Sequence, residues 1–228
     1  KLSGHGTPTP EHILSPEMAK LMMLAEKQSG FPGVGKNKIT LFNDANHGFE
    51  AIAKAIATAK KSIHMQYYIF QPDATGLFFR DALIEKARQG VECRLLVDDV
   101  GSFSLKKPFI KPLLDAGVKF ARFWPLTVSR PWGVHLRNHR KLVVIDGELG
   151  FMGSQNVGNE YLTLRRRRGH RQMAHSWKDT QVRIEGPAAN QLQTIFLEDW
   201  IFTTKEIINR DDYFSATPTH GGHSWTQS

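Results

Sequence analysis

Residues 139–156 read HRKLVVIDGELGFMGSQN, and two strand-like runs, 141–145 and 149–152, stand close together in this stretch. The residues between the two runs are too few to form a helix. Asp146-Gly147, which lies there, is a dipeptide that favours a tight turn between strands. The stretch therefore predicts an antiparallel hairpin.

The predicted hairpin brings four polar side chains together. Side chains two apart on a strand share a face, so His139 and Lys141 project from the same side of an otherwise apolar strand. A two-residue turn at 147–148 sets His139 opposite Asn156 and Lys141 opposite Ser154, and a turn one residue earlier shifts this pairing by two. Directly opposed residues point to the same face, so both registers predict that the four side chains converge.

These side chains have the chemistry of an oxyanion site with a nucleophile. They supply an imidazole, a fixed cation, a hydroxyl and an amide, and Gly153 allows the backbone to approach a ligand closely. Lys141, Ser154 and Asn156 could stabilise the charge that grows on the non-bridging oxygens of a phosphodiester. The alternative interpretation is an ordinary polar strand end. The return strand with Ser154 and Asn156 favours the site.

Short apolar runs alternate with helical periodicity around the hairpin. The pattern predicts strands at 39–42, 63–70, 91–97, 118–123 and 181–184 and helices at 48–61, 78–89, 110–115 and 188–201. Such runs are typical of strands buried on both faces, as in β-α-β units. We therefore expect an α/β fold, an α-β-α sandwich whose mixed, mostly parallel sheet has helices on both faces and carries the hairpin.

The two ends of the chain differ in composition from its middle. Residues 1–38 mix Pro, Gly and Ser with one short helical pattern at 15–27, and residues 215–228 are rich in Gly, Ser, Thr and His. The first segment is interpreted as an N-terminal arm and the last as a linker-like tail. Residues 39–214 are then expected to form a single domain.

Composition narrows the class of protein. With 40% hydrophobic residues, the chain is neither disordered nor of low complexity. Its formal net charge of +8 would attract a polyanion such as nucleic acid or an anionic lipid surface. No apolar run approaches the ~18 residues of a membrane span, so the chain is expected to be soluble or peripheral. The single cysteine, Cys93, excludes an internal disulfide or a cysteine metal cluster.

The hairpin stretch resembles the HKD motif of the phospholipase D superfamily. The match is His139-x-Lys141-x4-Asp146-x6-Gly153-Ser154-x-Asn156. Further segments resemble bacterial cardiolipin synthases, most of all their N-terminal half: AKKSIHMQYYIF at 59–70, RNHRK at 137–141, NEYL at 159–162 and WKDT at 177–180. The resemblance covers about residues 30–200, and it implies a phospholipase D-like fold.

The resemblance also implies roles for the site residues. His139 would be the nucleophile that forms a phosphohistidine intermediate, or the acid/base that faces it. Lys141 and Asn156 would bind the phosphate beside Gly153, with Ser154 as an additional donor. Asp179 would accept a hydrogen bond from the histidine ring, or would simply pair with a surface cation. Asp146, the third residue of the motif, is expected to brace the hairpin or an inter-domain contact rather than to touch the substrate.

The reaction that the resemblance implies is metal-independent and uses no cofactor. Two phosphatidylglycerol molecules would give cardiolipin and glycerol, or water would replace the second lipid in a phospholipase D hydrolysis. The family enzymes carry two HKD motifs and this chain carries one, so a second half in a longer chain or a homodimer is expected to complete the site. The alternatives are a homodimeric nuclease or phosphodiesterase of the same superfamily, with nucleic acid the less favoured partner, and a non-catalytic half-domain.

Three other features carry predictions. Asp98-Asp99 follows an apolar strand, where it would form a turn or site wall rather than a Mg²⁺ site. Of Tyr67 and Tyr68, one is expected to pack and the other to approach the site. A cationic run is expected to contact anionic lipid headgroups such as phosphatidylglycerol. Its residues are Arg165, Arg166, Arg167 and Arg168. The resemblance to cardiolipin synthases implies that the membrane is the bacterial cytoplasmic (inner) membrane.

Overall fold

The computed structural model describes residues 15–125, 137–161, 179–214 and 224–226. An eight-stranded sheet runs through these residues in the order β4-β3-β2-β5-β6-β7-β1-β8. Its strands are β1 (Val34–Phe42), β2 (Ser62–Tyr67), β3 (Glu92–Asp98), β4 (Lys119–Phe123), β5 (Leu142–Ile145), β6 (Leu149–Gly153), β7 (Gln181–Glu185) and β8 (Ser224–Thr226).

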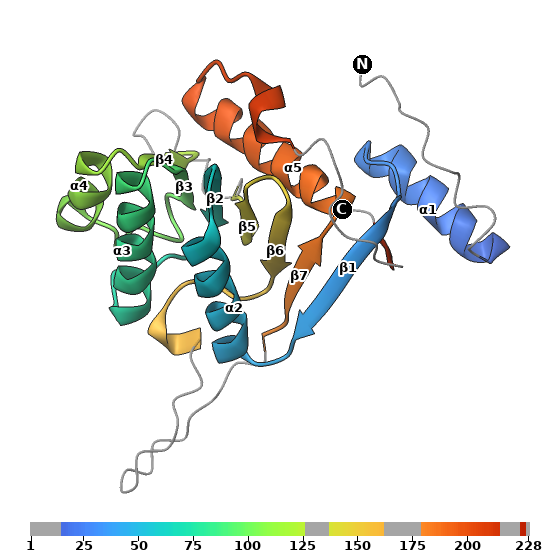
Figure 1. Ribbon diagram of the computed structural model, residues 1–228, viewed down its shortest axis with the longest axis horizontal. Coiled ribbons are helices and arrows are strands. Elements are labelled where there is room, and N and C mark those ends of the chain that lie inside the picture. Colours follow the sequence, from blue (N-terminus) through green and yellow to red (C-terminus); the bar gives the residue numbers. More distant parts are fainter. Residues whose placement is uncertain (1–14, 126–136, 162–178, 215–223, 227–228) are drawn as a thin grey trace, which may run out of the picture.

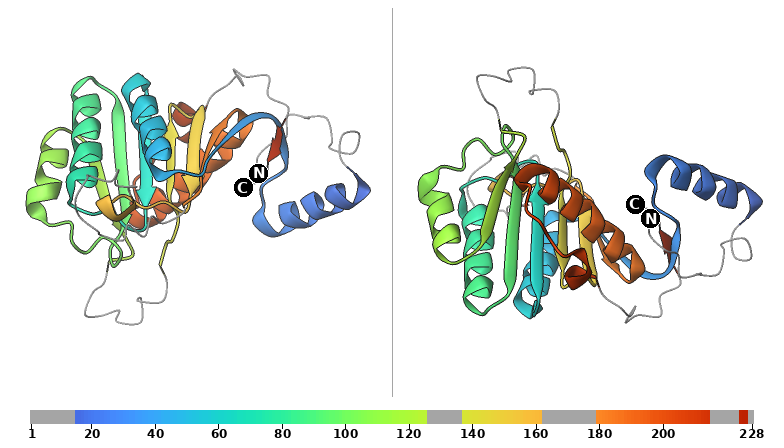
Figure 2. Two further views of the ribbon diagram at one scale, coloured as in Figure 1. Left: turned by 90° about the horizontal axis from the view of Figure 1, so that it is seen from below. Right: turned by 90° about the horizontal axis from the view of Figure 1, so that it is seen from above.

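Helices cover both faces of the sheet, which confirms the predicted α/β sandwich with a mixed sheet. One face packs against α2, α3 and α4, and the other packs against α5 (Figure 1; Figure 2). The helices are α1 (Pro16–Ser29), α2 (Ala45–Thr58), α3 (Ala74–Arg88), α4 (Lys107–Asp115) and α5 (Pro187–Thr204), with short 3-10 turns at Asn159–Tyr161 and Arg210–Tyr213. The side chain of Asp44 caps α2 by accepting two backbone N–H groups of the first turn, and that of Asp73 caps α3 by accepting one.

The prediction that the sheet is mostly parallel is wrong. Only the β2–β3 and β3–β4 pairs are parallel, and the other pairs of the described strands are antiparallel. Strands β2 and β5 are buried along their whole length because helices lie on both faces. Burial on both faces does not fix strand direction, which the connections set. Only α3 and α4 connect neighbouring strands as crossovers, and the rest of the sheet is built from antiparallel pairs.

The hairpin of β5 and β6 has a register that differs from both predicted ones. Leu142 lies opposite Met152 and Ile145 lies opposite Leu149, so three residues, 146–148, connect the strands. Asp146 and Gly147 have positive φ angles of 54° and 72°, and the Glu148 N–H donates to the Ile145 carbonyl at 3.0 Å. The turn lies where it was predicted, but it has three residues instead of two, and the extra residue shifts the pairing.

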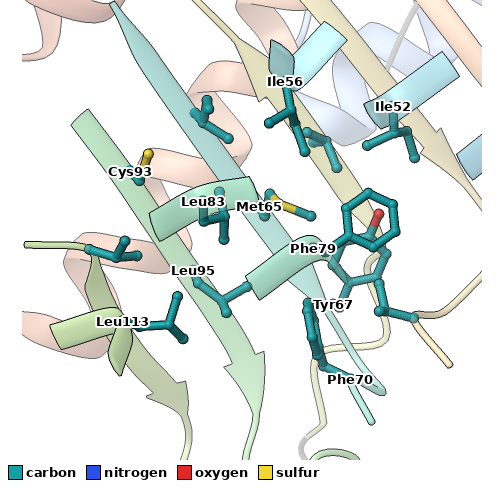
Figure 3. Close-up of a cluster of buried hydrophobic side chains, with 14 of the residues drawn as sticks. Ile52, Ile56, Met65, Tyr67, Phe70, Phe79, Leu83, Cys93, Leu95 and Leu113 are labelled. Atoms are coloured by element: carbon teal, nitrogen blue, oxygen red, sulfur yellow. The ribbon is translucent and has the colours of Figure 1, made fainter. Parts of the chain in front are cut away.

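Two apolar cores lie on the two faces of the sheet. Along β5, Val143 belongs to the core on the side of α2, α3 and α4, and Val144 belongs to the core under α5. Figure 3 shows the first core, in which side chains of β2 and β3 meet those of the helices. Its labelled members are Ile52, Ile56, Met65, Tyr67, Phe70, Phe79, Leu83, Cys93, Leu95 and Leu113.

Buried polar contacts fix α5 on its face of the sheet. His64 on β2 is fully buried. Its Nδ1 accepts a hydrogen bond from Gln193 Nε2 at 2.8 Å, and its ring stacks on that of Phe196. Burial, followed by the neighbouring Arg94, lowers the pKa of His64 to about 3, so the ring is neutral at physiological pH. Arg94 also bonds to Glu206, just beyond α5. These contacts fix the position of α5 on the sheet, and with it the positions of the other side chains of this helix.

The N-terminal segment lies at the β1 side of the sheet. Figure 2 shows α1 apart from the sandwich, and none of its residues is buried. The strand predicted from residue 39 begins at Val34, and β8, from the segment interpreted as a tail, pairs with β1. Among the described residues, no helix has the length and apolar character needed to cross a bilayer.

Candidate active site

His139 lies where the carboxyl ends of β2 and β3 meet the start of β5. Its side chain is exposed, and its ring lies 4.4 Å from the ring of Tyr68, measured between centroids. Tyr67 is buried in the core. The prediction that one of these tyrosines packs while the other approaches the site is therefore confirmed, with Tyr68 as the residue at the site.

Lys141 lies buried directly beside His139. Its Nζ is 3.0 Å from His139 Nδ1 and donates to the His139 carbonyl oxygen at 2.8 Å. The same ammonium lies 5.3 Å from the centre of the Tyr68 ring. Burial lowers the pKa of Lys141 from 10.5 to about 8, and the carboxylate of Asp179 acts in the opposite direction. The lysine is therefore a cation at pH 7 that loses its charge in mildly alkaline solution.

The same surroundings favour a neutral His139. Partial burial, followed by the Lys141 ammonium, lowers the pKa of His139 below its usual 6.5, against the opposite influence of Asp98. A neutral imidazole has a free lone pair and can attack an electrophile at physiological pH. The pair thus combines a nucleophilic ring with a fixed positive charge, which is the combination that attack on a phosphodiester requires.

Asn156 is buried at the wall of the site. Its Oδ1 accepts the Ile69 N–H at 3.0 Å, and its Nδ2 donates to the Tyr161 hydroxyl at 3.1 Å. The amide therefore ties the chain that leaves β2 to the chain that leaves β6. Within the described residues these contacts, rather than one with Lys141, occupy its oxygen and nitrogen.

Ser154 and Asp179 form a pair next to Lys141. The Ser154 hydroxyl donates to Asp179 Oδ1 at 2.7 Å and accepts the Thr180 N–H at 3.1 Å. Asp179 Oδ2 is buried and has no hydrogen-bond partner in the described part of the chain. The structure joins Asp179 to Ser154 and not to the ring of His139, so a contact of Asp179 with the nucleophile stays a prediction.

Gly153 is required by the packing of two strands. A Cβ atom at this position would lie 2.2 Å from the Thr180 carbonyl oxygen and 2.7 Å from Gln181 Oε1. Because this space is taken by β7, the close backbone approach that Gly153 allows is an approach to β7. Its expected role in binding phosphate stays a prediction.

Asp146 braces the hairpin at the end of β5 that is remote from Lys141. Its Oδ1 accepts the N–H groups of Lys61 at 2.7 Å and Ser62 at 2.9 Å, and its Oδ2 accepts that of Lys60 at 2.9 Å. The carboxylate thereby ties the turn to the segment that leads into β2. Of the three residues that name the motif, Asp146 is a structural member and lies outside the group around His139.

We expect that Asp146→Ala lowers the free energy of unfolding by about 2–4 kcal/mol, because three backbone N–H groups lose a charged acceptor. Urea denaturation monitored by circular dichroism measures this loss. Asp146→Asn is the matched control, since asparagine tolerates the positive φ and keeps one acceptor oxygen, and its loss should be smaller. A loss below about 0.5 kcal/mol for the alanine variant would show that the brace is dispensable.

Asp98 and Asp99 form a turn and a site wall. Asp98 Oδ1 accepts the N–H groups of Val100 and Gly101 at 2.9 and 3.0 Å, and Asp99 pairs with Arg122. The described residues contain no group of three His, Cys, Asp or Glu side chains that could hold a metal. The hydrogen bonds of Asp98 therefore confirm the predicted turn. The run Arg165–Arg168 lies outside the described residues.

Sequence reasoning missed the contacts that hold the segment before His139. The Asn138 N–H donates to Asp98 Oδ2 at 3.3 Å, and Arg137 forms an ion pair with Asp98 at 3.5 Å. Asp98 thus fixes the approach to β5 as well as its own turn. The available signal was that two polar residues, Arg137 and Asn138, directly precede a motif histidine.

Two cavities flank His139. One, of about 660 Å³, lies toward α5 and has Phe31, Met152, Leu192 and Ile195 in its wall together with His139 and Lys141. The other, of about 370 Å³, is lined by Phe123 and residues 137–140. The histidine therefore borders two cavities from which a ligand can reach it.

An α/β sandwich that carries one HKD motif on a hairpin, with a buried lysine beside an accessible histidine, defines a phospholipase D-like domain. Comparison with known families gives the particular family. The family model described as "Cardiolipin synthase, PLD-like domain" matches residues 52–200, and the chain belongs to that family.

Curated relatives agree with this assignment. The chain is 39% identical over 194 residues to cardiolipin synthase 1 of Bacillus anthracis, a match that covers 84% of this chain and 36% of the relative. It is 43% identical over 166 residues to the major cardiolipin synthase ClsA of Bacillus subtilis, covering 72% of this chain and 33% of that protein. The chain thus spans about a third of the length of these relatives.

Solved structures share the fold at low sequence identity. A phosphatidylserine synthase from Haemophilus influenzae aligns with a TM-score of 0.58 at 14% identity, covering 90% of this chain and 51% of that chain. NucT from Helicobacter pylori aligns with a TM-score of 0.52 at 15% identity, covering 72% of this chain and 96% of that one. At such identities the likeness concerns the fold alone.

Proposed function

We propose that this chain supplies one half of a metal-independent site for phosphatidyl transfer, in which two phosphatidylglycerol molecules yield cardiolipin and glycerol. The observation that carries the proposal is the pair formed by a neutral, accessible His139 and a buried, charged Lys141. The family to which the chain belongs supports phosphatidylglycerol as the substrate.

The proposed reaction has two displacements at phosphorus. A nitrogen of the histidine nucleophile attacks the phosphorus of phosphatidylglycerol, the bond to the glycerol oxygen breaks, and glycerol leaves with a proton from the histidine of a second motif. The glycerol hydroxyl of a second phosphatidylglycerol then gives its proton to the histidine of the second motif, attacks the phosphorus and releases the nucleophilic histidine. Water in place of this hydroxyl gives phosphatidic acid. His139 serves either as the nucleophile or as the proton donor that faces it.

The contact between His139 and Lys141 suggests how phosphate binding prepares the ring. When the Lys141 ammonium donates to Nδ1, the neutral ring carries its proton on Nε2, which then cannot attack. An anionic phosphate competes for the ammonium and frees Nδ1. The proton can then reside on Nδ1 if an acceptor stabilises it, and Asp179 Oδ2, buried and without a partner in the described part of the chain, is the acceptor that we propose.

The proposed substrate also defines the partners. Phosphatidylglycerol is a bilayer lipid, so we propose that the protein works at a membrane surface, with the basic run Arg165–Arg168 near anionic headgroups. The second histidine must come from another HKD motif. It would be supplied either by a second half in a longer chain or by a second copy of this one.

The test compares two substrates in the presence of EDTA. The whole protein that carries this sequence is incubated with phosphatidylglycerol in mixed micelles and, separately, with single-stranded and double-stranded DNA. We expect cardiolipin and glycerol to form and DNA to stay intact, since no metal is required. Cleavage of DNA with phosphatidylglycerol left unchanged would refute the proposal in favour of a nuclease.

A further inference from the structure

One carboxylate oxygen on α5 accepts hydrogen bonds from three side chains, at the edge of the sheet where His139 lies. Asp199 Oδ2 accepts hydrogen bonds from Gln66 Nε2 at 2.7 Å and from Asn138 Nδ2 at 2.6 Å, and it also pairs with the guanidinium of Arg140. The Asp199 side chain is only 15% exposed. An acceptor with three donors in a largely buried place is held in a fixed position.

Two of these donors are the residues on either side of His139. Asn138 makes a second contact, in which its Oδ1 accepts the Arg140 N–H at 3.1 Å. The backbone therefore turns around residue 139, with the side chains of Asn138 and Arg140 drawn to Asp199. The ring of His139 instead lies against Tyr68 and Lys141.

Asp199 lies on a part of α5 that packs into the core. Its neighbours on the helix, Phe196 and Trp200, are buried in the core under α5, and the third donor, Gln66, lies on the central strand β2. Asp199 therefore connects the segment of His139 to a helix and a strand that are both packed in the core. The segment itself is short and leads from residues 126–136 into β5.

We propose that Asp199 is a positioning residue for His139, which fixes the backbone on both sides of the histidine so that the ring is held beside Lys141. This role rests on the proposed function in so far as His139 takes part in the transfer. Small displacements of a reacting group are costly, and a shift of about 1 Å can reduce turnover about 100-fold. The carboxylate also balances the charge of Arg140, which would otherwise add to the positive field at the site.

The first test is independent of turnover. In the 228-residue chain, Asp199→Asn is compared by NMR with the wild type, following the pKa of the His139 ring and the hydrogen exchange of the Arg140 amide. Lys141 and Asp98 are the charged groups that act on this pKa. We expect the pKa of His139 to move toward 6.5 as contact with Lys141 loosens, and the exchange to accelerate at least tenfold. Both values unchanged in a folded variant would overturn the proposal.

Asp81→Asn is the matched control, because Asp81 also pairs with an arginine, Arg80, but does so on α3. It should leave both NMR values unchanged. If Asp199→Asn does not fold, Asn138→Ala and Arg140→Met replace it, since each removes one donor and leaves the helix intact. At least one of these two variants must change the amide exchange or the pKa of His139. If both variants leave both quantities unchanged, the proposal is refuted.

The second test separates positioning from binding by kinetics in the whole protein that carries this sequence. Asp199→Asn should lower kcat by about 10- to 100-fold with KM within about twofold of the wild type, because the phosphate ligands stay in place. A variant with wild-type kcat would overturn the role in catalysis. Wild-type protein without turnover would refute the proposed function instead, and the NMR result would still decide the position of His139.

Discussion

Replacement of His139 by alanine should reduce phosphatidylglycerol turnover on the order of 10⁴-fold or more, because the variant lacks either the nucleophile or the proton donor of the reaction. The fold should be unaffected. The side chain of His139 is exposed and contacts only Tyr68 and Lys141 among the interactions described for it. Loss of activity with an unchanged thermal midpoint is therefore the expected combination.

The measurement is the initial rate of glycerol release by the whole protein that carries this sequence, with the thermal midpoint of each variant determined on the same sample. His47→Ala is the control, since His47 is an exposed histidine on α2 outside the site. It should retain the wild-type rate. If the His139→Ala variant keeps more than about a tenth of the wild-type rate, His139 takes no part in the reaction, since loss of either the nucleophile or the proton donor has a larger effect.

The second large effect is expected at Lys141. Lys141→Gln removes the fixed cation that faces the phosphate, and loss of one such electrostatic donor typically reduces turnover by about 10²- to 10³-fold. The ammonium acts on the charge that develops at the non-bridging oxygens, so kcat should fall more than the affinity for lipid. A variant in which only KM rises would show that Lys141 binds the ground state alone.

The pH profile gives an independent check on Lys141. Because its pKa is lowered to about 8, the side chain is charged below pH 8 and becomes neutral as the pH rises through this value. Turnover should therefore decline above about pH 8. Lys141→Arg keeps its charge at every accessible pH, so whatever activity it retains should lack this decline. An alkaline limb that persists unchanged in the arginine variant would assign the limb to another group.

The fold was predictable to the extent that burial and periodicity determine it. The hairpin, the main helices and the layer arrangement follow from alternating apolar runs, and the structure confirms them. Strand direction was not predictable, because β2 and β5 are equally buried whether their neighbours run parallel or antiparallel. The hairpin register also failed, since the sequence Asp146-Gly147-Glu148 supports a turn with either two or three connecting residues.

The site was predictable where the chemistry is local in sequence. His139 and Lys141 are two residues apart just before β5, and the structure places them in contact. Partners from distant elements were not predictable. Asp199 reaches Asn138 from a helix that begins at Pro187, and neither residue belongs to the HKD motif. Only the three-dimensional packing of α5 on the sheet reveals that contact.

The most direct test of the central claim is the stoichiometry of products from phosphatidylglycerol in the presence of EDTA, measured on the whole protein that carries this sequence. The molar mass of the same sample, from light scattering, gives the number of HKD motifs in the active species. We expect one glycerol for each cardiolipin, formed by a species with two motifs and insensitive to chelation. A two-motif species that needs a divalent metal, or that leaves phosphatidylglycerol unchanged, would contradict phosphatidyl transfer through His139 and Lys141.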